Sequence, residues 1–457
     1  MSFEIPEGLM VSVSGVRGRV GEALTPDVVL RFAAAFGAYL LETAGGRPTV
    51  VLGRDSRTSG PLLARAVSSA LEGVGCDVVD VGLVPTPTAL LAVRHHGAAG
   101  GVIVTASHNP IEWNALKLAS GDGMFLDAEQ AAALRAQLEG RPPWQGWDGI
   151  GRVTTDDAAV ERHLRRILDL PFVDVAALRE RRFRVALDCV HGAGGTTLPR
   201  LLEALGCEVH GIGLEPDGRF PRRPEPVAGN LGELESLVRE TGADIGLATD
   251  PDADRLSLVD ETGRAMGEDY TLALATRLVL RHRVGPVVTN LSTSRVVEDA
   301  AIEGGAAFHR APVGEINVAR RMQQEDAVVG GEGNGGVILP TVHHTRDAQV
   351  AAVLVLQLLL ETASTPSEIA GGRTRYSIVK DSVARPEGEL APAYDRLEGE
   401  LGAPMADRQD GLWLGWPDQR KWLHFRPSGT EPIVRMIAEA RDEADARQLV
   451  AAAREAL

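Results

Sequence analysis

Three aspartates alternate along a short stretch of the chain, in the sequence DPDADR at 250–255. Asp250, Asp252 and Asp254 lie between two apolar runs, IGLAT and LSLVD, which predict strands joined by a tight loop. Carboxylates at this spacing can converge on one hard cation, and oxygen ligands favour magnesium or calcium over zinc. Without a cation the like charges would repel one another. The motif therefore predicts a divalent-metal site, with a solvated acidic turn as the alternative.

Two other kinds of protein use aspartates at a similar spacing. A calcium EF-hand loop needs glycine at its sixth position for a sharp turn, and here that position holds Arg255, which argues against it. A phosphatase with a nucleophilic aspartate in a D-x-D motif is the closer rival. The third carboxylate, Asp254, fits a metal site better than it fits a nucleophile paired with an acid.

A serine next to a histidine forms the second candidate, in TASHNP at 105–110. The loop follows the apolar run GGVIV, and open α/β sheets bind ligands in the loops at the carboxyl ends of their strands. Ser107, beside His108, could act as a nucleophile or carry a phosphoryl group. A plain turn is the alternative, because Ser, Asn and Pro are common in turns. The G-x-S-x-G motif of hydrolases is absent at this position.

Two further loops supply polar groups next to glycines, which allow close approach to a ligand. GGEGNGG at 330–336 offers Glu332 and Asn334, which suit sugar hydroxyls, although a glycine-rich hairpin is the alternative. RPSGTEPIVR at 426–435 combines an arginine fork with hydroxyls and backbone amides, which is typical of anion sites, and its alternative is a capped turn. No G-x-x-x-x-G-K-[ST] motif occurs in the chain, which argues against an ATP-dependent kinase.

Apolar runs alternate with helix-like stretches along most of the chain, which predicts α/β units. LEGVGCDVVDVGL at 71–83 resembles LEALGCEVHGIGL at 202–214, and each follows a strand and a turn. A weaker copy begins with PVVTNL at 286–291. We therefore predict three related α/β domains in tandem and a smaller C-terminal α+β domain, where the repeat is absent. The predicted domains are 1–150, 151–257, 258–370 and 371–457.

The composition limits the partners of the chain. It has 457 residues, 44% of them hydrophobic, and a formal net charge of −16. Nucleic-acid-binding surfaces are normally basic, so no nucleic-acid partner is expected, although local arginines can still bind an anionic substrate. The chain has no run of about 18 apolar residues and no signal peptide, so we expect no membrane partner and a cytoplasmic location. The oligomeric state, monomer or homodimer, is left open.

With these four loops in this order, the sequence resembles the α-D-phosphohexomutase family, which includes phosphoglucomutase, phosphomannomutase and phosphoglucosamine mutase. The resemblance covers essentially the whole chain, including SGVRG at 14–18. It implies an isomerase with four domains around a central cleft. Such an enzyme interconverts hexose 6-phosphate and hexose 1-phosphate through a phosphoserine. The resemblance further implies a small-molecule sugar phosphate as partner, one Mg²⁺ ion per chain as cofactor, and hexose 1,6-bisphosphate as intermediate and activator.

The resemblance also implies a role for each site residue. Ser107 is the phosphoserine and, with Asp250, Asp252 and Asp254, a ligand of the metal. The other residues expected at the reacting centre are His108, Lys117, Arg17 and Arg255. The residues expected to bind the substrate are Glu332 and Asn334 at the sugar, and Arg426, Ser428, Gly429 and Thr430 at its phosphate. Because the chain contains only three lysines, the presence of Lys117 in SHNPIEWNALK strengthens the resemblance.

Two residues depart from the common family pattern. Asn334 stands where many members have serine, and Glu315 follows Val-Gly where many glucose and mannose enzymes have histidine. The GEGNGG form is similar to a subgroup often assigned to phosphoglucosamine mutase. This favours phosphoglucosamine mutase activity, with phosphoglucomutase or phosphomannomutase activity as the alternative. A third and less favoured alternative is a metal-dependent sugar-phosphate phosphatase.

Overall fold

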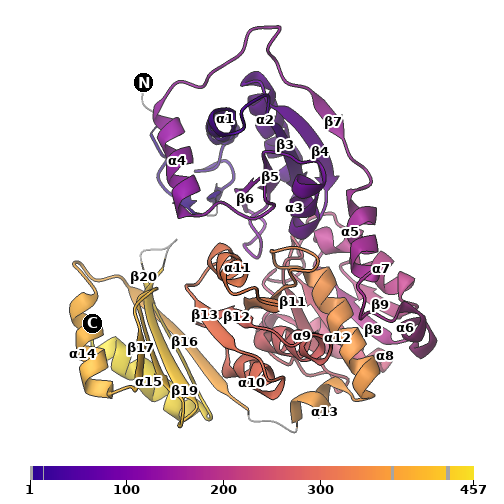
Figure 1. Ribbon diagram of the computed structural model, residues 1–457, viewed down its shortest axis with the longest axis vertical. Helices are drawn as coiled ribbons and strands as arrows, with labels where there is room; N and C mark the ends of the chain where they lie inside the picture. The colour runs from indigo at the N-terminus through magenta and orange to yellow at the C-terminus, as the bar shows by residue number, and fades with distance from the viewer. Residues whose placement is uncertain (1–3, 14, 372–374, 429–432) are drawn as a thin grey trace.

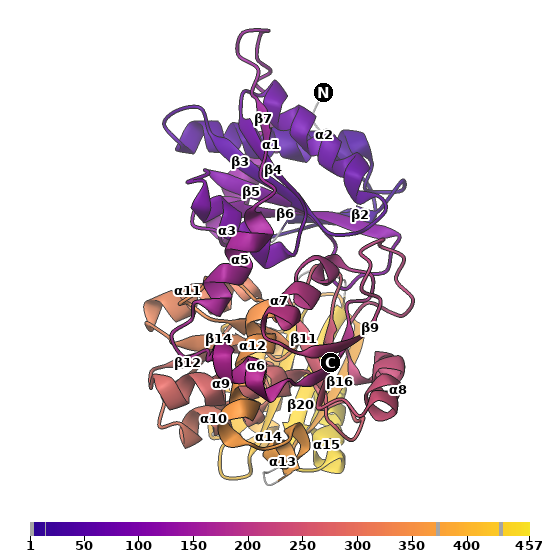
Figure 2. The ribbon, with the colours of Figure 1, turned by 90° about the vertical axis from the view of Figure 1, so that its right-hand side faces the viewer.

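The computed structural model describes the whole chain except residues 1–3, 14, 372–374 and 429–432. Four domains follow one another along it (Figure 1). The first lies at the top of that view, the second and third lie together below it, and the fourth lies beside the third. Figure 2 shows helix α5 (Ala159–Leu168) leading from the first domain down to the second.

The first domain is built on a seven-stranded sheet of order β1-β2-β6-β5-β3-β4-β7. Strand β3 lies between two parallel neighbours, β4 and β5, and β6 runs antiparallel to β5. Because β7 pairs with β4, the chain leaves this sheet a few residues after the predicted boundary at 150. The strands are β1 (Met10–Ser12), β2 (Gly15–Arg19), β3 (Thr49–Arg54), β4 (Asp77–Leu83), β5 (Gly100–Val104), β6 (Trp113–Ser120) and β7 (Val153–Thr155). The helices are α1 (Pro26–Thr43), α2 (Gly60–Gly73), α3 (Thr86–His95) and α4 (Ala128–Glu139).

The second domain repeats this arrangement in a four-stranded sheet of order β11-β10-β8-β9. Strand β8 lies between two parallel neighbours, and β11 runs antiparallel to β10. The predicted boundary at 257 is wrong by a few residues, because it would cut β11. The strands are β8 (Arg184–Asp188), β9 (Glu208–Ile212), β10 (Ile245–Thr249) and β11 (Leu256–Val259). Besides α5, the helices are α6 (Val175–Arg181), α7 (Leu198–Ala204) and α8 (Gly232–Thr241), with short 3-10 turns at Ala193–Thr196 and Ala228–Asn230.

The third domain has the same sheet again, in the order β13-β12-β14-β15, with the first three strands parallel and the last antiparallel. The predicted tandem repeat of three α/β domains is therefore confirmed. The strands are β12 (Val287–Asn290), β13 (Phe308–Ala311), β14 (Val329–Glu332) and β15 (Gly336–Ile338). The helices are α9 (Glu268–His282), α10 (Arg295–Glu303), α11 (Glu315–Gln324), α12 (Ala348–Thr362) and α13 (Pro366–Gly371).

The fourth domain is the predicted α+β unit, an antiparallel sheet of order β16-β20-β19-β18-β17. Burial alternates along much of β20, as expected for a sheet with one face packed on helices. The strands are β16 (Ser377–Ala384), β17 (Met405–Asp407), β18 (Leu412–Trp416), β19 (Lys421–Pro427) and β20 (Ile433–Ala440). The helices are α14 (Ala391–Leu401) and α15 (Glu443–Glu455).

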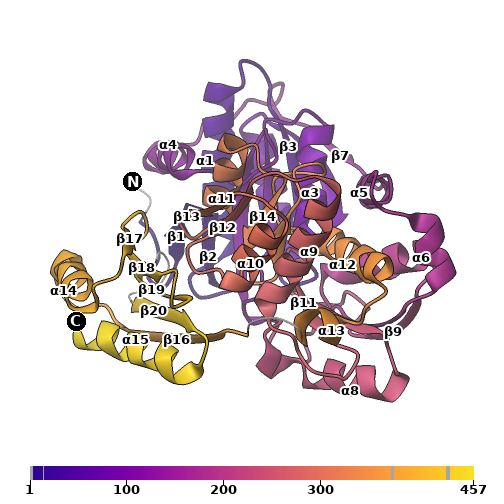
Figure 3. The ribbon, with the colours of Figure 1, turned by 60° about the horizontal axis from the view of Figure 1, so that its bottom comes forward.

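The second and third domains share one hydrophobic core, in which α12 is the central helix. Its sequence, AQVAAVLVLQLLLET, is buried along most of its length, and a helix that is apolar on all sides must be covered on all sides. Helix α12 lies beside α9 of its own domain and also contacts α5 and α6 of the second domain (Figure 3). One continuous core therefore supports the loops that follow β10 and β14. Among the described residues, no helix combines the length and apolar character needed to cross a bilayer.

Candidate active site

Three of the four predicted loops occupy the same place in their domains. Each connects the third strand of the repeat to the antiparallel fourth strand. The serine loop (105–112) joins β5 to β6, the aspartate loop (250–255) joins β10 to β11, and the glycine loop (332–336) joins β14 to β15. The repeated fold therefore explains why the sequence carries one such motif per α/β domain. The Leu256 N–H donates to the Gly335 carbonyl at 2.9 Å, which joins the aspartate and glycine loops directly.

Ser107 lies in the serine loop with its side chain against the aspartate loop. Its Oγ donates a hydrogen bond to Asp250 Oδ2 at 2.9 Å, and His108 Nδ1 lies 3.4 Å from the same Oγ. The φ angle of Ser107 is +49°, in the left-handed region that residues other than glycine rarely adopt. Its amide is held by the Thr105 hydroxyl at 3.0 Å. This strained turn brings a buried serine hydroxyl into contact with the acids.

The three aspartates are fully buried, and in two of them only one oxygen accepts a hydrogen bond from the described residues. Asp252 Oδ2 accepts from the Thr86 hydroxyl at 2.6 Å and from Lys117 Nζ at 2.7 Å. Asp254 Oδ2 accepts from Arg346 at 2.6 Å. The Oδ1 atoms of Asp252 and Asp254 are buried and have no hydrogen-bond partner within the described part of the chain.

This arrangement fits the divalent cation that the sequence predicts. One oxygen from each of the three aspartates lies within 4.8 Å of the other two. An all-oxygen donor set is the one that Mg²⁺ prefers in proteins. Buried carboxylate oxygens without a partner are costly, and a cation would supply that partner.

Burial and neighbouring charges act differently on the acids of this loop. Burial, reinforced by Asp254 and Asp252, raises the pKa of Asp250 well above its usual range. Burial acts in the same direction on Asp254, but Arg346 and Lys117 outweigh it and lower the pKa of that carboxyl. The pKa of Lys117 is raised, because Asp252 and Asp254 outweigh the burial of its ammonium group. The cations therefore keep Asp254 ionised, whereas at Asp250 the opposing effects of Arg255 and Lys117 are weaker than burial and the two neighbouring acids.

The other predicted residues of the reacting centre surround this group. Arg255 Nε lies 3.9 Å from Asp250 Oδ2. Arg17, on β2, donates to the Asn109 side chain of the serine loop at 2.7 Å. Burial, together with the charges of Arg255 and Arg17, lowers the pKa of His108 well below its ordinary value. The structure thus gathers Arg17, His108 and Arg255 around the serine and aspartate loops.

Glu332 is buried, and both of its oxygens are bonded within the protein. Oε1 accepts from Asn290 Nδ2 at 2.8 Å and from the Gly314 N–H at 3.1 Å. Oε2 accepts from Arg346 at 2.8 Å and from Asn334 Nδ2 at 3.4 Å. A carboxylate offers about four acceptor sites. In this arrangement Glu332 therefore has none left for a sugar hydroxyl, and binding a sugar requires some of these bonds to change.

Glu315, one of the two departures from the family pattern, is turned toward the protein as well. It accepts from Arg346 Nε and from the Arg346 backbone N–H, each at 3.1 Å. The same arginine explains one glycine of the glycine loop, because a Cβ at Gly336 would lie 2.2 Å from Arg346 Cδ. A Cβ at Gly335 would lie 2.5 Å from the Leu256 carbonyl oxygen. At these two positions, glycine therefore makes room for neighbouring groups of the protein and not for a ligand.

The fourth domain meets the third domain at Asp410, which also pairs with Arg426. Arg426, in β19, lies 2.8 Å from Asp410 Oδ2, and the Val313 N–H donates to the same oxygen at 3.0 Å. The guanidinium predicted to bind phosphate is thus paired with a carboxylate at the boundary of the third and fourth domains. The other predicted residues of this loop are Ser428, which is half-buried, and Gly429 and Thr430, which lie outside the described residues.

Sequence reasoning missed Arg57, which is completely buried beneath the serine loop. Its Nε donates to Asp55 Oδ2 at 3.0 Å. Its terminal nitrogens donate to four backbone carbonyls, those of Ser107, Asn109 and Pro110 at 2.6 Å and that of Trp113 at 3.0 Å. The polar turn GRDSRTSG gave no signal of this role, because such turns are common on protein surfaces.

Arg346 was also missed, although it contacts both the aspartate and the glycine loop. It is 6% exposed, and its guanidinium donates to Asp254, Glu332 and Glu315. Its only sequence signal is its position in HTRDA, just before the apolar helix α12. An arginine that is buried at the start of such a helix needs a buried partner for its charge.

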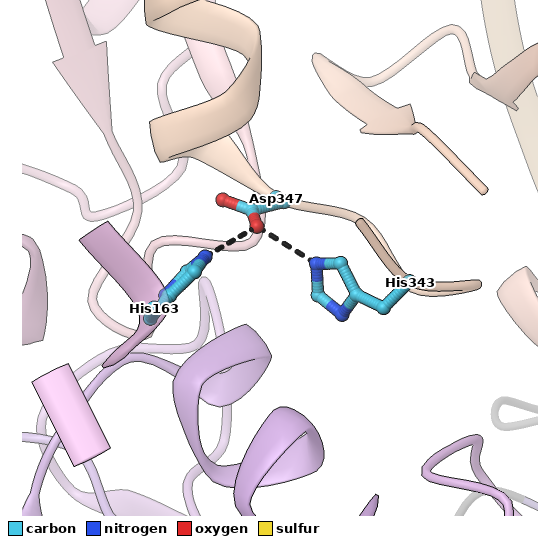
Figure 4. A group of neighbouring side chains, drawn as sticks. All are labelled: His163, His343 and Asp347. Carbon is cyan, nitrogen blue, oxygen red and sulfur yellow. Dashed lines mark hydrogen bonds and ion pairs between the residues drawn. The ribbon is translucent and has the colours of Figure 1, made fainter. Parts of the chain in front are cut away.

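A second group with metal-binding residue types includes Asp347, the residue directly after Arg346 (Figure 4). Asp347 Oδ2 lies 2.8 Å from His163 Nε2 and 2.7 Å from His343 Nε2. His163 Nδ1 lies 2.8 Å from the Thr88 hydroxyl, and Asp347 Oδ1 caps the start of α12. These are hydrogen-bond lengths, and each polar atom of Asp347 is satisfied by them. We therefore assign the group as a hydrogen-bonded triad rather than as a metal site.

Comparison with known proteins identifies relatives over the whole chain. Four sequence models of the phosphoglucomutase/phosphomannomutase family match in order: alpha/beta/alpha domain I at 9–142, domain II at 161–263, domain III at 267–376 and the C-terminal domain at 386–456. A "probable phosphoglucosamine mutase" of Methanopyrus kandleri is 40% identical over 447 residues, which are 97% of this chain and 96% of the relative.

The chain is also similar to a second curated protein and to a solved structure. A "phosphoglucomutase/phosphomannomutase" of Thermococcus kodakarensis is 37% identical over 446 residues, 96% of each chain. Among solved structures, a phosphoglucomutase/phosphomannomutase family protein from Burkholderia thailandensis superimposes with a TM-score of 0.84 at 27% identity, and covers 98% of this chain and 96% of its own.

Proposed function

Because the chain belongs to the phosphoglucomutase/phosphomannomutase family of phosphohexomutases, which are isomerases, we propose that it interconverts glucosamine 6-phosphate and glucosamine 1-phosphate through phosphorylated Ser107. The observation that carries the proposal is the 2.9 Å hydrogen bond from Ser107 Oγ to Asp250, inside the buried group of three carboxylates. The relative from M. kandleri and the glycine loop with Asn334 support glucosamine as the sugar.

The proposed reaction moves a phosphoryl group twice. In the first transfer, the free hydroxyl oxygen of the bound sugar phosphate bonds to the phosphorus on Ser107, and the bond from that phosphorus to Ser107 Oγ breaks. The sugar hydroxyl loses its proton to a nearby base, and hexose 1,6-bisphosphate results. After the bisphosphate turns around, Ser107 Oγ takes the other phosphoryl group, and the freed sugar oxygen regains a proton. His108 and Lys117 are the candidates for proton transfer or charge stabilisation.

Asp250, Asp252 and Asp254, together with an oxygen at Ser107, would hold one Mg²⁺ ion. When bound, such an ion neutralises crowded negative charge and polarises the phosphoryl group. Phosphorylated Ser107 would carry nearly two negative charges beside these acids. Lys117, 2.7 Å from Asp252 Oδ2 and 3.4 Å from Asp254 Oδ2, offsets part of that repulsion with the protein's own charge.

The two remaining loops would bind the substrate at its two ends. Arg426, with Ser428, Gly429 and Thr430, is proposed to hold the phosphate that is not transferred, since a guanidinium suits phosphate oxygens. For this, Arg426 has to exchange its ion pair with Asp410 for the phosphate. Glu332 and Asn334 are proposed to contact the sugar hydroxyls once their present hydrogen bonds rearrange.

Rates on the 1-phosphates of glucosamine, glucose and mannose test the proposed sugar, each measured with its matching 1,6-bisphosphate as activator. We expect kcat/KM to be highest for glucosamine 1-phosphate, by more than about tenfold, or roughly 1.4 kcal/mol of transition-state discrimination. Ratios within tenfold would indicate a promiscuous enzyme. A preference for glucose or mannose would instead support the activity named for the T. kodakarensis relative.

The carrier role is tested by Ser107→Ala, which removes the oxygen that holds the phosphoryl group and should reduce turnover to the background rate. Ser236→Ala, on the exposed face of α8, is the matched control and should leave turnover unchanged. Chelation of divalent metal with excess EDTA should also stop turnover. Near-wild-type rates of Ser107→Ala would contradict the proposal, and stoichiometric release of inorganic phosphate would support the phosphatase alternative.

A further inference from the structure

Arg346 occupies a buried position between carboxylates from three segments of the chain. Its Nη2 donates to Asp254 Oδ2 at 2.6 Å, its Nη1 to Glu332 Oε2 at 2.8 Å, and its Nε to Glu315 Oε2 at 3.1 Å. A guanidinium is planar and rigid, so these bonds hold the acceptors in a defined arrangement. Arg346 therefore joins the aspartate loop of the second domain directly to the glycine loop of the third.

The bonds of Arg346 also decide which carboxylate oxygens remain for ligands. At Asp254, Arg346 and Lys117 contact Oδ2, and the buried Oδ1 has no hydrogen bond among the described residues, although Arg255 Nε lies 3.8 Å from it. At Glu332, Arg346 takes Oε2, while Asn290 and one backbone N–H take Oε1. Arg346 thus orients Asp254, a proposed metal ligand, and also takes up an acceptor oxygen of Glu332, which is proposed to bind the sugar.

The surroundings of Arg346 hold it in this position. On one side, Gly336 leaves no room to move toward the glycine loop, since even a Cβ there would lie 2.2 Å from Arg346 Cδ. On the other, the neighbouring Asp347 is bonded to His163 and His343 and caps α12 (Figure 4). The backbone of Arg346 is therefore anchored to the shared core of the second and third domains.

We propose that Arg346 is a positioning residue that couples metal binding at the aspartate loop to sugar-phosphate binding at the glycine loop. It acts through Asp254 and Glu332, and the inference rests on the proposed metal role of the aspartate loop. Charge alone predicts the opposite effect on the metal. A nearby guanidinium repels a cation, so its removal would strengthen metal binding if it served only as a charge. Loss of a group that orients a metal ligand weakens metal binding.

The test is to titrate Mn²⁺, as a spectroscopic substitute for Mg²⁺, into the wild-type chain and Arg346→Lys by electron paramagnetic resonance. Lysine keeps the charge but cannot span three carboxylates. We expect the Kd for Mn²⁺ to rise about 10- to 100-fold. We also expect kcat to fall and the KM for glucosamine 1-phosphate to rise in the same variant. Equal or tighter Mn²⁺ binding by Arg346→Lys would overturn the inference.

The coupling itself is measured by calorimetric titration of glucosamine 1-phosphate with and without Mn²⁺. In the wild-type chain Mn²⁺ should change the Kd of the sugar phosphate by at least about fivefold, and in Arg346→Lys this change should disappear. A change of the same size in the variant would overturn the coupling. If the wild-type chain binds no Mn²⁺, the proposed metal role fails together with the inference. If it binds Mn²⁺ and the variant binds it equally well, only the inference fails.

Two further variants guard against a general loss of structure. Glu315→Gln removes the charge of one partner of Arg346 but leaves Arg346 and both loops intact, so it should weaken Mn²⁺ binding by a smaller factor. It decides the question if Arg346→Lys does not fold, because unchanged Mn²⁺ binding would then overturn the inference. Arg295→Lys is the matched control, since Arg295 is also buried but pairs with Glu298, at 3.2 Å. It should leave Mn²⁺ binding unchanged.

Discussion

Replacement of Arg57 by methionine tests whether a buried cation holds the serine loop in its strained conformation. Methionine is apolar and of similar length, so it removes the charge and the donors while filling part of the space. Arg57 is completely buried, and so is its partner Asp55. The variant would leave Asp55 with the Thr105 hydroxyl, at 2.7 Å, and the backbone N–H of residue 57, at 2.9 Å, as its remaining donors.

The expected loss of stability follows from these contacts. Burial raises the pKa of Asp55, and Arg57 opposes that rise, so the variant would leave a buried charge without its counter-ion. Removing one partner of a buried ion pair typically costs about 3–5 kcal/mol. The four carbonyls that lose their donor would add to this where water cannot reach them, at about 1 kcal/mol each. We therefore expect the first domain to lose at least about 4 kcal/mol of unfolding free energy.

The loss of activity has a separate cause. Three of the four carbonyls belong to residues 107, 109 and 110, so without Arg57 the serine loop can relax from its strained turn. A displacement of about 1 Å at a reacting group can cost about 100-fold in rate. We expect kcat to fall by about that factor at a temperature where the variant is folded.

The assay combines thermal unfolding with kcat measured well below the unfolding midpoint. The double variant Arg57→Met with Asp55→Leu removes both charges, and should regain part of the stability, because apolar replacement of a buried pair is often neutral. It should not regain activity, since the carbonyls of the serine loop remain without donors. If Arg57→Met keeps kcat within tenfold of wild type, or if the double variant recovers full activity, Arg57 does not position the serine loop.

Two more predictions address the glycine loop and the boundary of the fourth domain. Gly336→Ala should displace Arg346, lower kcat and cost about 1–3 kcal/mol of stability through overpacking. The control is Gly399→Ala, at an open position on α14, which should leave kcat unchanged. Kinetics and thermal unfolding of both variants check this prediction. Burial raises the pKa of Glu439, which accepts from the Arg295 N–H at 2.9 Å, to about 7. The unfolded chain releases this proton near pH 4.5, so stability should fall as pH rises from 4.5 to 7. Glu439→Gln should remove at most about 3 kcal/mol of that fall. Unfolding midpoints measured for both proteins across this pH range test this. The same dependence on pH in both proteins would contradict the prediction.

The order and type of the domains could be predicted from the sequence because they depend on local patterns. Similar helix-to-strand segments recur at 71–83 and 202–214, and they form α2–β4 and α7–β9 in the structure. The boundaries at 150 and 257 were less accurate. β7 and β11 belong to their sheets through pairing with β4 and β10, and pairing between strands does not appear in a local pattern.

The motifs of the site were also recognisable, since each consists of adjacent residues with unusual chemistry. The residues that hold the motifs in place were not. Arg57 contacts the Ser107 carbonyl across 50 positions of the chain, and Arg346 contacts Asp254 across 92. A single arginine in a polar turn looks the same in sequence whether it lies on the surface or inside the protein.

The sequence by itself therefore determined which chemical groups the protein has: a serine, three aspartates, a lysine and loops rich in glycine and arginine. Only the tertiary structure decided which of their atoms are free to act. Each carboxylate oxygen has a limited number of lone pairs, and donors from other domains compete for them. That competition saturates Glu332 and pairs Arg426 with Asp410. Among the described residues it leaves one oxygen of Asp252 and one of Asp254 without a hydrogen bond, in the group of acids that Ser107 contacts.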